Sequence, residues 1–146
     1  MKKLIASIVM ILVIASTSVF AAFPASVNPG YSGNSTGVIV ITNPPKDKSA
    51  TFDSSYIISG YGKEGAVVKL YTLSNGKYVP TNYTWTIGAS GLFFKKINLN
   101  AGKNNILVVA QTSTSLEQTA YLEITYLGAN VSQSIKNITV NVNNVF

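Results

Sequence analysis

Short β-rich runs separated by turn residues dominate the sequence beyond residue 36. Eight runs are rich in β-branched and aromatic residues, and they cover residues 37–42, 55–61, 65–73, 77–79, 82–88, 91–99, 104–112 and 118–127. Beyond residue 21, no stretch places its apolar residues at the interval of about 3.6 that marks a helix. Many short strands with turn signals between them are typical of an all-β sandwich. The pattern therefore predicts a β-sandwich of about seven to eight strands.

Two turn signals predict where strands end. Proline cannot donate a hydrogen bond to a neighbouring strand, so Pro44 and Pro45 end the first run. Asn75 and Gly76 lie between two runs, and both residue types tolerate the positive φ angles of a type I′ turn. The sequence therefore predicts a β-hairpin with a two-residue turn at this point.

Alternation within the runs predicts which side chains form the core. The inward side chains are Ala66, Val68, Leu70, Ile106, Val108, Ala110, Ala120, Leu122, Ile124, Tyr56, Ile58, Tyr83, Trp85, Ile87, Phe93, Ile97 and Leu99. Burying about fifteen such side chains, at roughly 1.5–3 kcal/mol each, lets a domain of this size fold without disulfides. Lys95 shares its side of the strand with Phe93, which predicts either a β-bulge or a lysine that reaches water at the sheet edge.

The first 21 residues have the layout of a secretory signal peptide. Lys2 and Lys3 give a positive start, residues 4–14 are almost continuously apolar, and small residues lead to Ala21. This order predicts cleavage after Ala21 and a secreted, extracellular protein, either released or held at the cell surface. The alternative is an uncleaved anchor over residues 4–23, which is the one contact with a membrane that we consider.

The chain contains no Cys, His or Arg. These absences remove thiolate and imidazole nucleophiles, zinc sites of the Cys/His type and disulfides. The carboxylates are scattered, at Asp47, Asp53, Glu64, Glu117 and Glu123. After cleavage, nine Lys against these five acids leave a net charge of about +4, spread along the chain rather than clustered as in nucleic-acid-binding proteins. We therefore expect no enzyme, no catalytic residue, no metal or cofactor and no nucleic-acid partner.

Several segments resemble a known family. The first are residues 41–44 (ITNP), 56–60 (YIISG) and 65–70 (GAVVKL), which look like the opening of a bacterial immunoglobulin-like module. The second are residues 91–93 (GLF), 97–99 (INL) and 102–110 (GKNNILVVA), which resemble the G-x-F…V-x-L-x-x-G-x-N-x-I-x-V-x-A run of immunoglobulin-like modules of the glucodextranase domain-B type. The resemblance implies an immunoglobulin-like β-sandwich over residues 37–127, and it carries no catalytic or binding residues with it.

The two ends of the exported chain lie outside this resemblance. Residues 22–36 combine Pro, Gly, Ser and Asn without periodicity, which predicts a flexible N-terminal arm. Residues 128–146 form a C-terminal tail in which Ile138, Val140 and Val142 alternate with polar residues, as in an extra strand. The tail is long enough to pack on its own domain, which we favour, or to add a strand to a neighbouring copy.

One outward sheet face is more apolar than a solvent-exposed sheet normally is. Its residues come from runs 65–73, 104–112 and 118–127, and they are Val67, Tyr71, Leu107, Val109 and Tyr121. We favour a cover made by the chain's own arm or tail, with a protein partner or a second copy as the alternative. These residues and Tyr78 are the candidate binding residues.

Exposed aromatic side chains could also bind a carbohydrate. Tyr71 and Tyr78 flank the Asn75-Gly76 turn, and we expect both to be exposed, whereas we expect Trp85 to lie in the core. The leading hypothesis is a non-catalytic secreted module with a structural, adhesive or protein-interaction role. The alternatives are a carbohydrate-binding module that recognises a cell-surface glycan, and a subunit that assembles through its tail. The sequence leaves the oligomeric state open.

Overall fold

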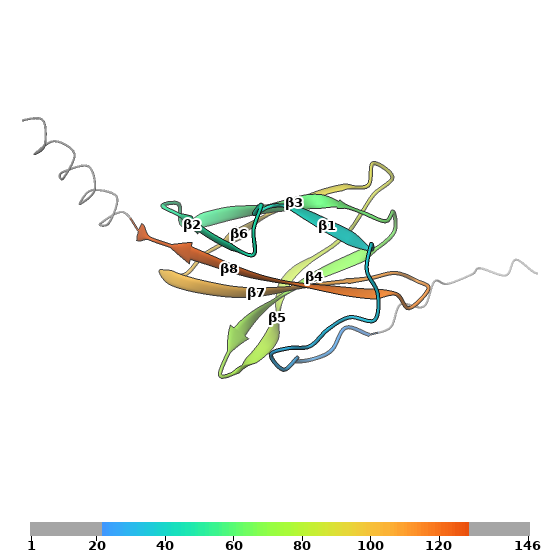
Figure 1. Ribbon diagram of the computed structural model, residues 1–146, viewed down its shortest axis with the longest axis horizontal. Helices are drawn as coiled ribbons and strands as arrows, with labels where there is room; N and C mark the ends of the chain where they lie inside the picture. Colours follow the sequence, from blue (N-terminus) through green and yellow to red (C-terminus); the bar gives the residue numbers. More distant parts are fainter. Residues whose placement is uncertain (1–21, 129–146) are drawn as a thin grey trace, which may run out of the picture.

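The computed structural model describes residues 22–128, which form two β-sheets that pack face to face (Figure 1). The three-stranded sheet has the order β1-β3-β6 and contains β1 (Ile39–Asn43), β3 (Ser55–Gly62) and β6 (Leu92–Asn98). The five-stranded sheet has the order β2-β8-β7-β4-β5 and contains β2 (Lys48–Thr51), β4 (Val67–Ser74), β5 (Lys77–Thr86), β7 (Gly102–Gln111) and β8 (Glu117–Tyr126). The predicted all-β sandwich is therefore confirmed. Within these residues, no helix is long and apolar enough to cross a membrane.

The strands differ from the predicted runs at two places. The runs 77–79 and 82–88 belong to one strand, β5, whose pairing with β4 shifts between Lys69 and Tyr71. There the Thr81 hydroxyl donates a hydrogen bond to the Leu70 carbonyl at 2.8 Å, which keeps the strand paired across the irregularity. Strand β2 was not predicted, because its sequence Lys-Ser-Ala-Thr has no apolar alternation and only its parallel pairing with β8 makes it a strand.

The turn between β4 and β5 is the predicted one. Asn75 and Gly76 have φ angles of 50° and 76°, and Ser74 pairs with Lys77 across them. Strand β1 ends at Asn43, directly before the two prolines. Both local predictions are confirmed.

The core lies between the two sheets. Every predicted inward side chain belongs to it, either fully buried or packed against the buried cluster. Trp85 contacts Phe93 with a ring-centroid distance of 5.9 Å, so its predicted place in the core is confirmed. Lys95 is half-buried on β6, an edge strand that pairs with β3 without any register shift. Of the two predicted explanations, the structure therefore agrees with a lysine that reaches water at the sheet edge and not with a β-bulge.

Candidate functional site

The outward face of the five-stranded sheet is covered by the chain's own N-terminal segment. Its apolar cluster consists of the buried residues Val27, Tyr71, Tyr78, Leu107 and Val109, with Phe23 and Tyr121 packed against them. We call this surface the sealed face. Of the predicted binding residues, Val67 alone stands outside the cluster, and it is half-buried. The sealed face is thus the surface that the sequence predicted, with the cover that we favoured.

Residues 22–36, predicted to be a flexible arm, lie along this sheet instead of projecting from it (Figure 1). The backbone N–H groups of Val27 and Tyr78 each donate to the other residue's carbonyl, at 2.9 and 2.8 Å. Gly33 approaches β8 so closely that an added Cβ would lie 2.3 Å from the Glu117 carbonyl oxygen. The prediction was wrong because Phe23 and Val27 anchor a segment whose overall composition is that of a linker.

The prediction that Tyr71 and Tyr78 are exposed was also wrong. Tyr71 has no exposed surface and Tyr78 retains 7%, because the N-terminal segment lies over both. The Tyr71 hydroxyl donates to the Pro24 carbonyl at 2.9 Å, and the Tyr78 ring meets the Tyr121 ring edge-on at 5.5 Å. A sugar ring could reach Tyr71 or Tyr78 only if the segment left the sheet.

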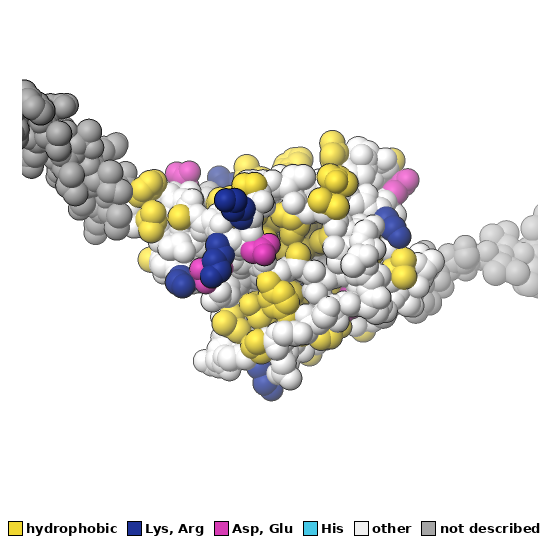
Figure 2. Space-filling view, in the orientation of Figure 1, with side chains coloured by type: hydrophobic (Ala, Val, Ile, Leu, Met, Phe, Trp, Pro, Cys, Tyr) yellow, Lys and Arg dark blue, Asp and Glu magenta, His cyan; other side chains and the backbone are white. Residues whose placement is uncertain are grey.

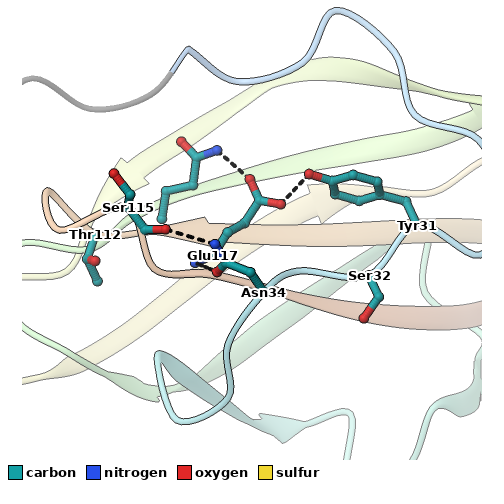
Figure 3. Close-up of a pocket in the computed structure, with 7 residues that line it drawn as sticks. Tyr31, Ser32, Asn34, Thr112, Ser115 and Glu117 are labelled. Carbon is teal, nitrogen blue, oxygen red and sulfur yellow. Dashed lines mark hydrogen bonds between the residues drawn. The ribbon is translucent and has the colours of Figure 1, made fainter.

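The far end of the segment is fixed at the turn between β7 and β8. Figure 3 shows the Tyr31 hydroxyl pointing toward the Glu117 carboxylate, to which it donates a hydrogen bond. The Gln111 side-chain amide donates to the same carboxylate. The Asn34 side chain accepts from the Glu117 N–H at 2.7 Å and donates to the Ser115 carbonyl at 3.1 Å. These bonds tie the segment to Glu117 of β8 and to Ser115 of the turn, and Gln111 of β7 holds the Glu117 side chain in place.

The phenol groups of this region are held in their neutral form. Burial raises the pKa of Tyr71 to about 12, with the negative charge of Glu117 as the second cause. The hydrogen bond to Glu117, and then burial, raise the pKa of Tyr31 to about 12. Burial also raises the pKa of Tyr78. Anchoring of the segment is therefore tied to protonated tyrosines.

The hollow beside Glu117 is lined by the polar groups that anchor the N-terminal segment. It has a volume of about 310 Å³, and Glu117 is the one ionisable carboxylate among its lining residues. Both oxygens of that carboxylate accept hydrogen bonds, one from Tyr31 and the other from Gln111. Within residues 22–128, no three His, Cys, Asp or Glu side chains come together as metal ligands would.

The outward face of the three-stranded sheet is apolar and uncovered by any described residue. Its five large hydrophobic side chains are exposed to between 41% and 76%, and they are Val40, Ile57, Tyr61, Leu92 and Phe94. We call this surface the open face. Figure 2 shows hydrophobic side chains along the margin of the molecule where β1, β3 and β6 lie. Exposed apolar surfaces of this kind are found at protein and membrane contact sites and at ligand-binding grooves.

Strand register brings the open face together. Tyr61 pairs with Val40 on one side and with Leu92 on the other, which makes an apolar row across all three strands. Phe94 stands opposite Ser59 in the next row, and Ile57 stands opposite Lys96 in the row beyond it. Because neighbours on one sheet face lie about 5 Å apart across strands, these side chains form one continuous surface.

The sequence contained a signal for the open face that the prediction did not use. The alternation that places Ile58, Phe93 and Ile97 in the core places their neighbours on the opposite side. Large apolar residues at those positions of two paired strands indicate an unusual outer surface. The other predicted candidates, Ile138, Val140 and Val142, lie outside the described residues.

Neither a protein-family model nor a curated protein sequence matches this chain.

Proposed function

We propose that this protein is a secreted, non-catalytic immunoglobulin-like module that binds a protein partner at or outside the cell surface through its open face. The observation that carries the proposal is the row Val40, Tyr61 and Leu92 with Phe94 beside it, all exposed on paired strands. Covering exposed apolar side chains with a partner lowers the free energy by roughly 25 cal/mol per Å² of apolar surface removed from water. Binding surfaces of this type need no catalytic group.

The strand order supports the immunoglobulin-like part of the proposal. Strands β1, β3 and β6 take the places of strands A, B and E of an immunoglobulin sandwich, while β4, β7 and β8 take those of C, F and G. Strand β5 then stands where variable-type domains have C′. The positive start, apolar run and small-residue end of residues 1–21 support export.

The composition of the open face favours a protein over a carbohydrate. Sugar rings stack on flat aromatic faces, whereas Val40, Ile57 and Leu92 are aliphatic and flank the two aromatic residues. Protein interfaces combine aromatic and aliphatic side chains in this way at their centres. Lys96 at one end of the face suits a partner that carries a carboxylate near its own apolar patch.

The test is retention of the labelled mature protein on the cells that produce it. Replacing Leu92→Ser together with Phe94→Ser is expected to lower retention by about tenfold, because two apolar anchors of the interface are lost. Leu73→Ser is the matched control, since Leu73 is also an exposed leucine but lies at the end of β4. All three side chains are exposed, so circular dichroism should stay native in every variant.

Protease treatment of the cells separates the candidate partners. Retention that falls after surface proteins are digested supports a protein partner. Retention that survives digestion and is competed by soluble polysaccharide would replace the proposal with the carbohydrate-binding alternative. Equal retention of the parent and the Leu92/Phe94 variant would show that the open face is not the binding surface.

A further inference from the structure

We infer that the partner docks as an extended segment that pairs with the free edge of β6, with a carboxylate beside Lys95 and an apolar side chain beside Phe94. This inference rests on the proposed function, because it gives the form and the chemistry of the partner that the open face would bind. It combines three features of β6, which are its unpaired backbone, its share of the open face and its positive charge.

Strand β6 is an edge of the three-stranded sheet, so one side of its backbone has no strand partner. In antiparallel pairing, every second residue turns its N–H and C=O toward the neighbouring strand. The Gly62 N–H donates to the Gly91 carbonyl at 2.8 Å, and the Leu99 N–H donates to the Ser54 carbonyl at 2.9 Å. Both bonds continue the register of β3 with β6. The odd-numbered residues of β6 therefore turn their backbone groups toward β3, and the even-numbered residues turn theirs to the free edge.

The backbone groups in the middle of this edge are free. The N–H groups nearer the ends of β6 donate to side chains, that of Leu92 to a serine hydroxyl at 3.3 Å and that of Asn98 to a tyrosine hydroxyl at 3.2 Å. Among residues 22–128, the outward N–H groups of Phe94 and Lys96 have no hydrogen-bond partner. They lie about 7 Å apart, which is the repeat of outward groups along a strand. An added strand would meet both.

The other edges of the two sheets carry features that hinder strand addition. Strand β2 has four residues, and β1 has five and ends directly before two prolines. Strand β5 contains Pro80, pairs irregularly with β4 and already pairs with Val27 of the N-terminal segment. Strand β6 has seven residues, no proline and an unbroken register with β3. It is therefore the edge best suited to accept an extended segment.

The free edge and the open face share residues. Phe94 and Leu92 have the most exposed large hydrophobic side chains of the described residues, at 76% and 66%. A strand added to β6 lies about 4.8 Å beyond it. Its residue beside Phe94 would stand on the open face, where an apolar side chain covers the ring. The contact then combines backbone hydrogen bonds with apolar cover, so it does not depend on the area of the face alone.

Lys95 and Lys96 give this edge a positive charge. Within residues 22–128 the ion pair joins Lys103 to Glu123, so neither lysine of β6 has an ionic partner there. Asp53 lines the same hollow as Lys96, whereas Lys95 is half-buried on the core side of the strand. Side chains directly opposite each other on paired strands lie about 5 Å apart, and opposite charges at this distance favour pairing. A carboxylate in the added strand would therefore be favoured opposite Lys95.

The same lysines argue against a second copy of this chain as the occupant. The seven residues of β6 include two lysines and no acid. Two copies of β6 side by side would bring four lysines into one short ladder, and like charges on paired strands are destabilising. Because Phe94 and Lys95 are adjacent, the charge selects a partner segment in which an apolar residue and an acidic residue are adjacent.

Removal of one outward N–H tests the backbone pairing. Retention of the labelled mature protein on producing cells is compared for Lys96→Pro and Lys96→Ala. Both variants lose the lysine side chain, but proline also lacks the N–H, which at this position faces away from β3. We expect Lys96→Pro to lower retention about tenfold relative to Lys96→Ala, because a backbone hydrogen bond to the partner is lost. Circular dichroism and the fluorescence of Trp85 should match the parent in both variants.

Reversal of one charge tests the acidic residue of the partner. Lys95→Glu would place two carboxylates opposite each other and should lower retention about tenfold. The matched control is Lys77→Glu, which makes the same change in net charge at the exposed turn after β4 and should be retained like the parent. This pair of variants decides the question if Lys96→Pro does not fold.

The outcomes separate this inference from the proposed function. If Leu92→Ser/Phe94→Ser lowers retention while the proline and glutamate variants match their controls, the strand pairing is wrong and the proposed function stands. If the proline and glutamate variants lower retention while the Leu92/Phe94 variant does not, the pairing stands and the open face is not the binding surface. A loss with Lys96→Pro but none with Lys95→Glu would overturn the acidic partner segment. Retention that rises when unlabelled protein is added would show that a second copy occupies the edge.

Discussion

Replacement of Tyr71 with alanine is expected to lower the free energy of unfolding by about 3–5 kcal/mol. Tyr71 has no exposed surface, and its ring fills the centre of the sealed face between Leu107 and the N-terminal segment. Removing the ring leaves a cavity and also removes the hydrogen bond to the Pro24 carbonyl. Urea unfolding followed by the fluorescence of Trp85, the single tryptophan, measures the change.

The comparison with Tyr71→Phe separates packing from hydrogen bonding. The phenylalanine keeps the ring and loses the hydroxyl alone, so its cost should be about 0.5–1.5 kcal/mol. If the alanine variant cost no more than the phenylalanine variant, the ring would contribute little and the N-terminal segment would not seal this face.

High pH is expected to release the N-terminal segment. The pKa values of Tyr31 and Tyr71 are raised from 10.0 to about 12, so folding favours their neutral forms. The stability that this contributes is fully present below pH 10 and is lost as the pH rises through about 12. The unfolded chain loses these phenol protons at a lower pH than the native protein does, so raising the pH favours the unfolded chain.

Limited proteolysis between pH 9 and 12 measures this release. Cleavage within residues 22–36 should increase steeply above pH 10, before the sandwich itself unfolds. The double variant Tyr31→Phe and Tyr71→Phe cannot ionise at these positions and should show a shallower increase. Identical pH profiles for parent and double variant would show that other groups, such as the lysines, control the release.

Alternation of side chains was enough to predict the layers of the sandwich. Each strand buries one side in the core, so Val68, Ile106 and Ile124 were found from their spacing alone. The Asn75-Gly76 turn was predictable for a similar reason, since its φ angles depend on two adjacent residues. Strand β2 was not predictable, because its four residues become a strand only beside β8.

The two outer faces show where sequence patterns are less informative. The apolar side chains of the sealed face were predicted, but the course of residues 22–36 depends on tertiary contacts such as Tyr31 with Glu117, 86 residues apart. No local pattern links residues that are so distant. The open face could have been predicted from the same alternation that identified the core. Its strongest local indication was Phe94, which follows the buried Phe93 and therefore points to the opposite side of the strand.

On the cells that produce the protein, we expect the open face to contact a partner protein. Photo-crosslinking from this face tests it most directly, with p-benzoylphenylalanine replacing Phe94 in one sample and Leu73 in the other. Irradiation on producing cells should yield a crosslinked product of higher mass from position 94 and none from position 73, because Leu73 is exposed away from the face. Products from position 94 that contain this chain alone, or equal products from both positions, would contradict the claim.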